Sequence, residues 1–182
     1  MKKAYVVGAA SVAAIIVAGC ASSPSAAPTP APGPATSTAD SDGQPPWPAP
    51  TDVPPRVAAA GLDLGPMGMA EHYHAQMRIV IRGTEVPVAP NIGVDPATGA
   101  MSAVHTHDGD GTIHIEAGTK GEVFTLGQVF TQWGMPLSPT QIGNVSAKTG
   151  ENFTATSNAT PIEGAPGGLR LRPEQRIELR LG

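Results

Sequence analysis

The sequence is poor in three features that would each point to a class of protein. Its 182 residues include a single cysteine, Cys20, which excludes an intrachain disulfide and a cluster of thiolate metal ligands. Its formal net charge is -4, and a mildly acidic chain is a poor candidate for binding nucleic acid. The signatures of zinc proteases, serine hydrolases and phosphate-binding loops are absent. Any chemistry must therefore come from other residues.

The first residues have the layout of a secretory signal peptide. Lys2 and Lys3 precede an apolar run over residues 4–18, which is too short for a comfortable membrane span and is followed by small residues. We therefore expect residues 1–19 to direct export and to be removed. No acidic residue precedes Cys20, so loss of the two lysines changes the formal charge from -4 to -6.

Residues 17–20 read Val-Ala-Gly-Cys, and they resemble the lipobox of bacterial lipoproteins. The resemblance implies that Cys20 receives a diacylglyceryl group, that the signal is cleaved before it, and that the new amino terminus is acylated with a fatty acid such as palmitate. More than one acyl chain gives stable membrane attachment, whereas a single chain is marginal. The implied location is the outer, extracytoplasmic face of the cell membrane.

Residues 20–58 have a composition typical of a disordered tether. Ala, Pro, Ser and Thr dominate, and Trp47 is the one large apolar residue. Such a segment favours extended, partly polyproline conformations over a packed core. The remaining residues, 59–182, suffice for one globular domain. They contain no apolar run long enough to span a bilayer, so we expect the lipid to be the membrane attachment.

All five histidines lie between residues 71 and 133, in three short blocks. The blocks are His72-Tyr73-His74, His105-Thr106-His107-Asp108 and His114-Ile115-Glu116. In an extended strand, side chains two residues apart point to the same face. Each block therefore directs two ligand-type side chains to one side.

Residues 108–111, Asp-Gly-Asp-Gly, predict a hairpin turn between the second and third blocks, because they tolerate left-handed backbone and lie between strand-type runs. In this hairpin His107 faces Thr112, and His105 faces His114. Opposed Cβ atoms on one face lie about 5 Å apart, so the three imidazoles converge. The histidine face also carries Glu116, and the opposite face, expected in the core, carries Val104, Ile113 and Ile115.

Converging imidazoles beside a carboxylate are typical of a site for a divalent transition metal. Copper or zinc is the expected ion, and iron is a further candidate. The expected ligands are His105, His107 and His114, with His72, His74, Asp108 and Glu116 completing or supporting the shell. His72 and His74 carry less weight, because Arg78 shares their strand face and a cation beside a metal ion is unfavourable. The alternative is that the histidines are polar residues on a solvated face.

Residues 125–134 predict a short helix. Thr125 and Gln128 form a capping box, and Gly134 followed by Pro136 ends the helix. One helix face is apolar and comprises Leu126, Val129, Phe130 and Trp133. We expect this face to pack on the apolar side of the sheet whose other side carries the histidines.

The strand-type runs lie around residues 74–82, 86–88, 142–146, 153–156 and 176–181. Strands, one helix across the sheet and further strands indicate an α+β fold. We expect a small β-grasp-like domain with one short helix packed on a sheet. An all-β sandwich that carries one short helix is the alternative.

Four motifs fall within this domain: His-x-His, His-Thr-His-Asp, Gly-x-Ile-His-x-Glu and Thr-Leu-Gly-x-x-Phe-x-x-Trp-Gly. They occupy residues 72–74, 105–108, 111–116 and 125–134. Together they resemble an uncharacterised group of small prokaryotic histidine-rich proteins. The resemblance covers roughly the first half of the domain, and it implies a functional site without naming a function.

Three interpretations of function follow. The first is a lipid-anchored protein that binds, sequesters or delivers a transition metal, and we favour it over catalysis. The second is a metal-dependent enzyme in which three histidines leave a coordination position open, with Asp108 or Glu116 as general base. The third is a metal-free module that binds a protein of the cell envelope, with a histidine patch that becomes charged near pH 6.

Overall fold

The structure is a computed structural model, and it describes residues 43–182. The expected signal peptide, Cys20 and most of the expected tether lie outside the described residues. Among residues 43–182, no helix has the length and apolar character needed to cross a membrane. The helical elements are α1 (Val53–Ala59), α2 (Leu126–Trp133) and a short 3-10 turn, η1 (Pro166–Gly168).

The longest strands are β2 (Glu71–Ile81), β6 (Thr112–Ala117), β10 (Phe153–Ser157) and β12 (Gln175–Leu181). The short strands are β1 (Leu64–Gly65), β3 (Thr84–Val86), β4 (Met101–Ser102), β5 (Val104–His105), β7 (Leu137–Ser138), β8 (Gln141–Ile142), β9 (Val145–Ser146) and β11 (Thr160–Pro161).

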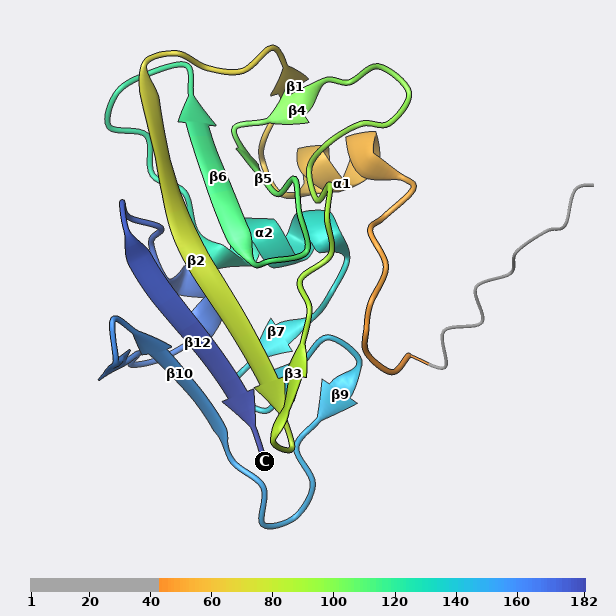
Figure 1. Ribbon diagram of the computed structural model, residues 1–182, viewed down its shortest axis with the longest axis vertical. Coiled ribbons are helices and arrows are strands. Elements are labelled where there is room, and N and C mark those ends of the chain that lie inside the picture. Colours follow the sequence, from red (N-terminus) through yellow and green to blue (C-terminus); the bar gives the residue numbers. More distant parts are fainter. Residues whose placement is uncertain (1–42) are drawn as a thin grey trace, which may run out of the picture. The chain divides into compact units, whose positions relative to one another are not determined.

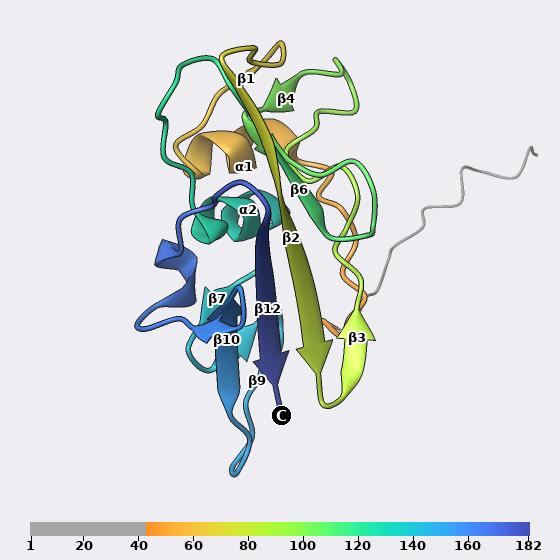
Figure 2. The ribbon, with the colours of Figure 1, turned by 60° about the vertical axis from the view of Figure 1, so that its left-hand side comes forward.

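One seven-stranded sheet organises the domain (Figure 1). Its strand order is β11-β10-β12-β2-β6-β5, and β3 pairs with the far end of β2. The central strands β2 and β12 are parallel, and every other pair in this sheet is antiparallel. The first long strand, β2, and the last strand, β12, thus lie side by side in the middle of the sheet (Figure 2).

The core lies on one face of this sheet, where α2 packs (Figure 1). Alternate residues of the central strands, including Met77, Ile79, Ile113, Ile115 and Leu179, join the apolar side chains of α2 in one buried cluster. Apolar side chains recur with a period of two along the strands and near 3.6 along the helix, so each element presents one apolar face to the core. The fold is therefore a mixed α+β arrangement, and the predicted packing of the helix against the sheet is confirmed.

The helix α2 begins and ends where its sequence signals place it. The backbone N–H of Thr125 donates to Gln128 Oε1 at 2.9 Å. At the other end, Gly134 adopts φ 76°, the left-handed conformation that favours glycine at a helix terminus. Leu126, Val129, Phe130 and Trp133 are buried, so the predicted helix and its apolar face are confirmed.

The ordered domain begins earlier than the boundary we expected at residue 59. Trp47 is buried, and its ring meets that of Trp133 edge to face with centroids 5.8 Å apart. The Trp133 indole N–H also donates to the carbonyl of Pro48 at 3.0 Å. Two further core residues, Val53 and Val57, come from α1. The prolines at the start of α1 suit a first helical turn, so a proline-rich composition concealed this helix.

Candidate metal centre

Three adjacent strands and the turn after β5 bring the five histidines together on the sheet face opposite the core. His74 of β2 pairs directly with His114 of β6, and His114 pairs with His105 of β5. These three residues therefore form a row across the sheet. The predicted opposition of His105 and His114 is confirmed.

The strand directions place the remaining two histidines on opposite sides of this row. Strands β2 and β5 run the same way, because each is antiparallel to β6. His72 precedes His74 and lies opposite Glu116, whereas His107 follows His105. The cluster thus extends diagonally across the sheet, with His114 at its centre.

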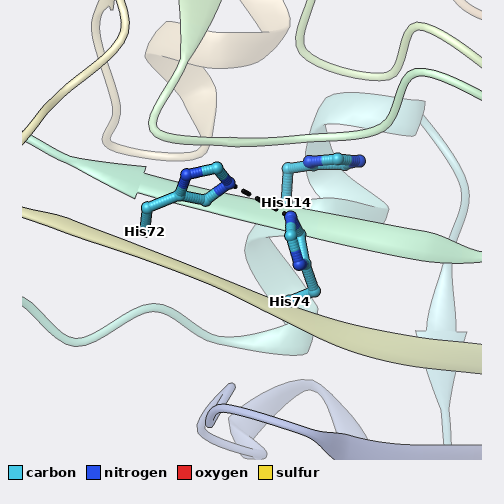
Figure 3. Close-up of side chains that lie close together, drawn as sticks. All are labelled: His72, His74 and His114. Carbon is cyan, nitrogen blue, oxygen red and sulfur yellow. Dashed lines mark hydrogen bonds between the residues drawn. The ribbon is translucent and has the colours of Figure 1, made fainter.

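Two groups of three imidazoles result, and both include His114. We call His72, His74 and His114 the outer triad, and His105, His107 and His114 the inner triad. Within each triad the ligand nitrogens lie within 4.8 Å of one another. Figure 3 shows the outer triad, in which the His72 and His74 rings meet beside His114. Sequence reasoning placed the main site in the inner triad and gave His72 and His74 a lesser part.

The closest nitrogen pairs have a spacing that suits a shared metal ion. The Nε2 atoms of His72 and His74 are 3.1 Å apart, and those of His105 and His107 are also 3.1 Å apart. Two nitrogens bound tetrahedrally at 2.0 to 2.1 Å lie about 3.3 Å from each other. Each pair can therefore chelate one ion after a small movement of the rings.

His105 is held in the state that a metal ligand requires. It is 1% exposed, and its Nδ1–H donates to the carbonyl of Ser102 at 2.9 Å. A carbonyl can only accept, so this bond places the ring proton on Nδ1 and leaves the lone pair on Nε2, toward His107. Such a second partner fixes the orientation of metal-binding histidines. No sequence pattern identified Ser102 for this role.

Burial also keeps these rings neutral. Burial lowers the pKa of His105 to about 4, and the nearby His107 acts in the same direction, although the bond to Ser102 opposes both. The pKa of His114 is likewise lowered, first by burial and then by His74. Neutral imidazole is the form that binds a metal ion.

The turn before β6 is built by short local contacts. The Asp110 carboxylate accepts the backbone N–H of Thr112 at 2.8 Å and its hydroxyl at 3.0 Å. Gly111 has φ 86°, and a Cβ atom there would come within 2.0 Å of the Met77 carbonyl oxygen. The close approach of the turn to β2 therefore requires glycine at this position.

His107 is not paired with Thr112, contrary to our expectation. The ladder between β5 and β6 ends at His105. The next residue, Thr106, instead donates its N–H to the Ile92 carbonyl at 3.0 Å and its hydroxyl to the Ala89 carbonyl at 2.9 Å. This loop contact draws the chain away from β6, so His107 lies in the turn and is exposed.

Glu116 lies beside the outer triad. The side chain is largely buried, and its Oε1 is 3.4 Å from His72 Nε2. Its other oxygen, Oε2, is buried and has no hydrogen-bond partner among residues 43–182. A buried carboxylate oxygen without a partner is costly, so the position favours a cation or an N–H donor.

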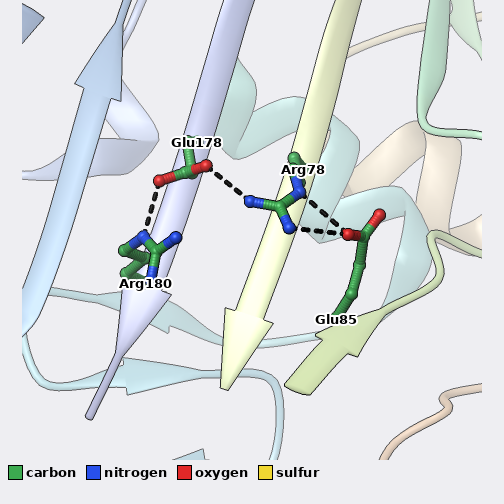
Figure 4. A network of polar contacts seen from close by, with 4 residues as sticks. All are labelled: Arg78, Glu85, Glu178 and Arg180. Atoms are coloured by element: carbon green, nitrogen blue, oxygen red, sulfur yellow. Dashed lines mark hydrogen bonds and ion pairs between the residues drawn. The ribbon is translucent and has the colours of Figure 1, made fainter. Parts of the chain in front are cut away.

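Asp108 and Arg78 lie outside the two triads. Asp108 is exposed and belongs to neither group. Arg78 shares the open face, but its guanidinium contacts Glu85 at 2.8 Å and Glu178 at 2.8 Å (Figure 4). Arg180 also contacts Glu178, at 2.6 Å. These carboxylates balance the charge of Arg78, which removes the objection to metal binding at His72 and His74.

Comparison of the chain with known protein families, with curated protein sequences and with solved structures gave no match.

The lowered pKa of His105 predicts that the stability of the metal-free protein depends on pH. Its ordinary pKa of 6.5 falls to about 4 in the fold, so between these pH values the unfolded chain binds a proton that the folded chain does not. Stability should therefore fall as the pH drops from 6.5 to 4, by up to about 3 kcal/mol from this residue. Urea unfolding with a chelator present measures the effect. A His105→Gln variant should lose stability less steeply over this range, and equal slopes would contradict the assignment.

Proposed function

We propose that this protein is a lipid-anchored extracytoplasmic protein whose domain binds a transition-metal ion through the histidine cluster. The arrangement of His105 carries the proposal. A buried, neutral imidazole whose second nitrogen is fixed by Ser102 directs its lone pair at a neighbouring imidazole. A solvated histidine patch has no need for such burial, because burial opposes the charged form.

The donor set favours copper or zinc. The two triads supply imidazole nitrogens, and the carboxylate of Glu116 flanks the outer triad at His72. Imidazole suits zinc, copper and iron, whereas carboxylate and carbonyl sites suit magnesium or calcium. With no thiolate in the domain, Cu(II) and Zn(II) fit best, and Fe(II) is the third choice.

Binding, sequestration or delivery fits this site better than catalysis. His72 and His74 lie on the open sheet face, where they line a shallow groove together with Lys120, Glu122 and Arg172. Enzyme sites usually enclose most of their substrate and exclude water. An open site instead permits exchange of an ion with solvent or with a partner protein of the cell envelope.

We further propose that the fold is of the β-grasp type. Its four longest strands have the order β6-β2-β12-β10, with the parallel pair at the centre. The helix α2 connects the first antiparallel pair to the second and packs on the core face. This arrangement of two hairpin-like pairs around a helix supports the proposal.

The lipid anchor rests on residues 17–20 and is tested directly. We expect the full chain, expressed in a bacterium fed a labelled fatty acid, to incorporate the label and to enter the detergent phase on phase separation. Cys20→Ala should abolish both. A wild-type chain that carries no label would contradict the proposed anchor.

Metal binding predicts a rise in melting temperature. With zinc or copper at 100 times its dissociation constant, the folded state gains about 2.7 kcal/mol, which corresponds to a rise of roughly 5 to 10 °C for a domain of this size. His114→Gln removes a ligand from both triads. The variant should therefore lose both the metal-dependent rise in melting temperature and the bound metal.

Arg176→Gln provides the control, because Arg176 is exposed on the same sheet face outside both triads. It should respond to metal like the wild type. If neither zinc, copper nor iron binds the full chain or changes its melting temperature, the metal proposal fails. A metal-free envelope interaction module is then the better account.

A further inference from the structure

The two triads share His114, which raises the question of how an ion occupies them. We propose that they are two successive positions for a single ion, which enters at the outer triad and is then held at the inner triad. This inference rests on the proposed metal binding and adds a direction of movement to it.

The five histidines do not form one coordination shell. His74 and His105 are separated by strand β6, and neither group of ligand nitrogens that lie within 4.8 Å of one another contains both residues. Two nitrogens bound to one ion at 2.0 to 2.1 Å are at most about 4.2 Å apart. In this arrangement of the side chains, His74, His114 and His105 therefore do not bind one ion together.

His114 connects the two positions. The ring centroids form a continuous series from His72 to His74 (4.9 Å), on to His114 (4.5 Å), to His107 (4.7 Å) and to His105 (4.7 Å). A neutral imidazole has one lone pair, so His114 binds one ion at a time. It can keep that ion while the other ligands are exchanged.

The two triads differ in solvent exposure, and this difference sets the direction in which the ion moves. In the outer triad, the side chain of His72 is 58% exposed, and the groove beside it is open to solvent. In the inner triad, His107 is also exposed, but His105 is 1% exposed and its ring is fixed by Ser102. The outer triad suits capture of a hydrated ion, whereas the preorganised inner triad suits slow release.

Transfer of the ion from the outer to the inner triad requires no change in its oxidation state. The bonds from the ion to His72 and His74 break, the bonds to His107 and His105 form, and the bond to His114 persists. No net proton is released, because each imidazole stays neutral and carries its N–H on the nitrogen that faces away from the ion. In the metal-free protein His107 donates to His105, so His107 must change tautomer, and its exposure to solvent permits this.

Two matched variants separate the positions. His72→Gln removes an exposed ligand from the outer triad, and His107→Gln removes an exposed ligand from the inner triad. Neither side chain is part of the core, so both variants should fold, which circular dichroism checks. Arg176→Gln serves as the surface control.

The probe is cobalt(II), a coloured substitute for zinc, mixed with the full chain in detergent and followed by stopped-flow absorbance. The wild type should bind one ion in two phases, a first whose rate rises with cobalt concentration and a second whose rate does not. His72→Gln should slow uptake about tenfold yet reach an affinity close to that of the wild type. His107→Gln should keep the first phase, lose the second and bind at least about tenfold more weakly.

Three results would overturn the exchange while leaving metal binding intact. They are wild-type uptake rates in His72→Gln, equal loss of affinity in both variants, and saturation at more than one ion per chain. Failure of the wild-type protein to bind cobalt, zinc or copper would instead defeat the proposed function and this inference together.

Discussion

The candidate site depends on the pairing register of three strands. The alignment of His74, His114 and His105 sets which imidazoles are neighbours. The same register places Ala75, Ile113, Ile115 and Val104 in the core. Because side chains alternate along a strand, a slip of one residue would turn the histidines inward and expose the apolar residues. Hydrophobic burial therefore enforces the geometry of the site without using any histidine.

The two faces of the sheet have separate roles. One face is covered by α2 and supplies the stability of the domain through apolar burial. The other is open, and it carries the histidine cluster near the start of β2 and the ion pairs of Arg78, Glu85, Glu178 and Arg180 further along (Figure 4). Exposed ion pairs contribute little stability. Their main consequence here is to balance the charge of Arg78 close to the outer triad.

Local patterns were sufficient for the antiparallel pairing of His105 with His114 and for the helix. Turn chemistry at residues 108–111 and the alternation in β6 predicted the opposition of His105 and His114. The capping signals of α2 act within a few residues, and they were equally reliable.

Features that depend on distant segments could not be predicted. Residues 89–92 bond to Thr106 and so displace His107 from the ladder. The carbonyl of Ser102 orients His105, and any residue type offers a carbonyl there. Trp47 enters the core from a segment whose composition is typical of a tether. The division of five histidines into two triads also required the strand order β2-β6-β5, which involves a nonlocal pairing.

X-ray absorption spectroscopy of the zinc-loaded full chain tests most directly whether the imidazoles hold a metal ion. The account predicts about three imidazole nitrogens at 2.0 to 2.1 Å, recognised by scattering from the outer ring atoms, with oxygen completing the shell. A shell made of oxygen alone, without the imidazole signal, would contradict it.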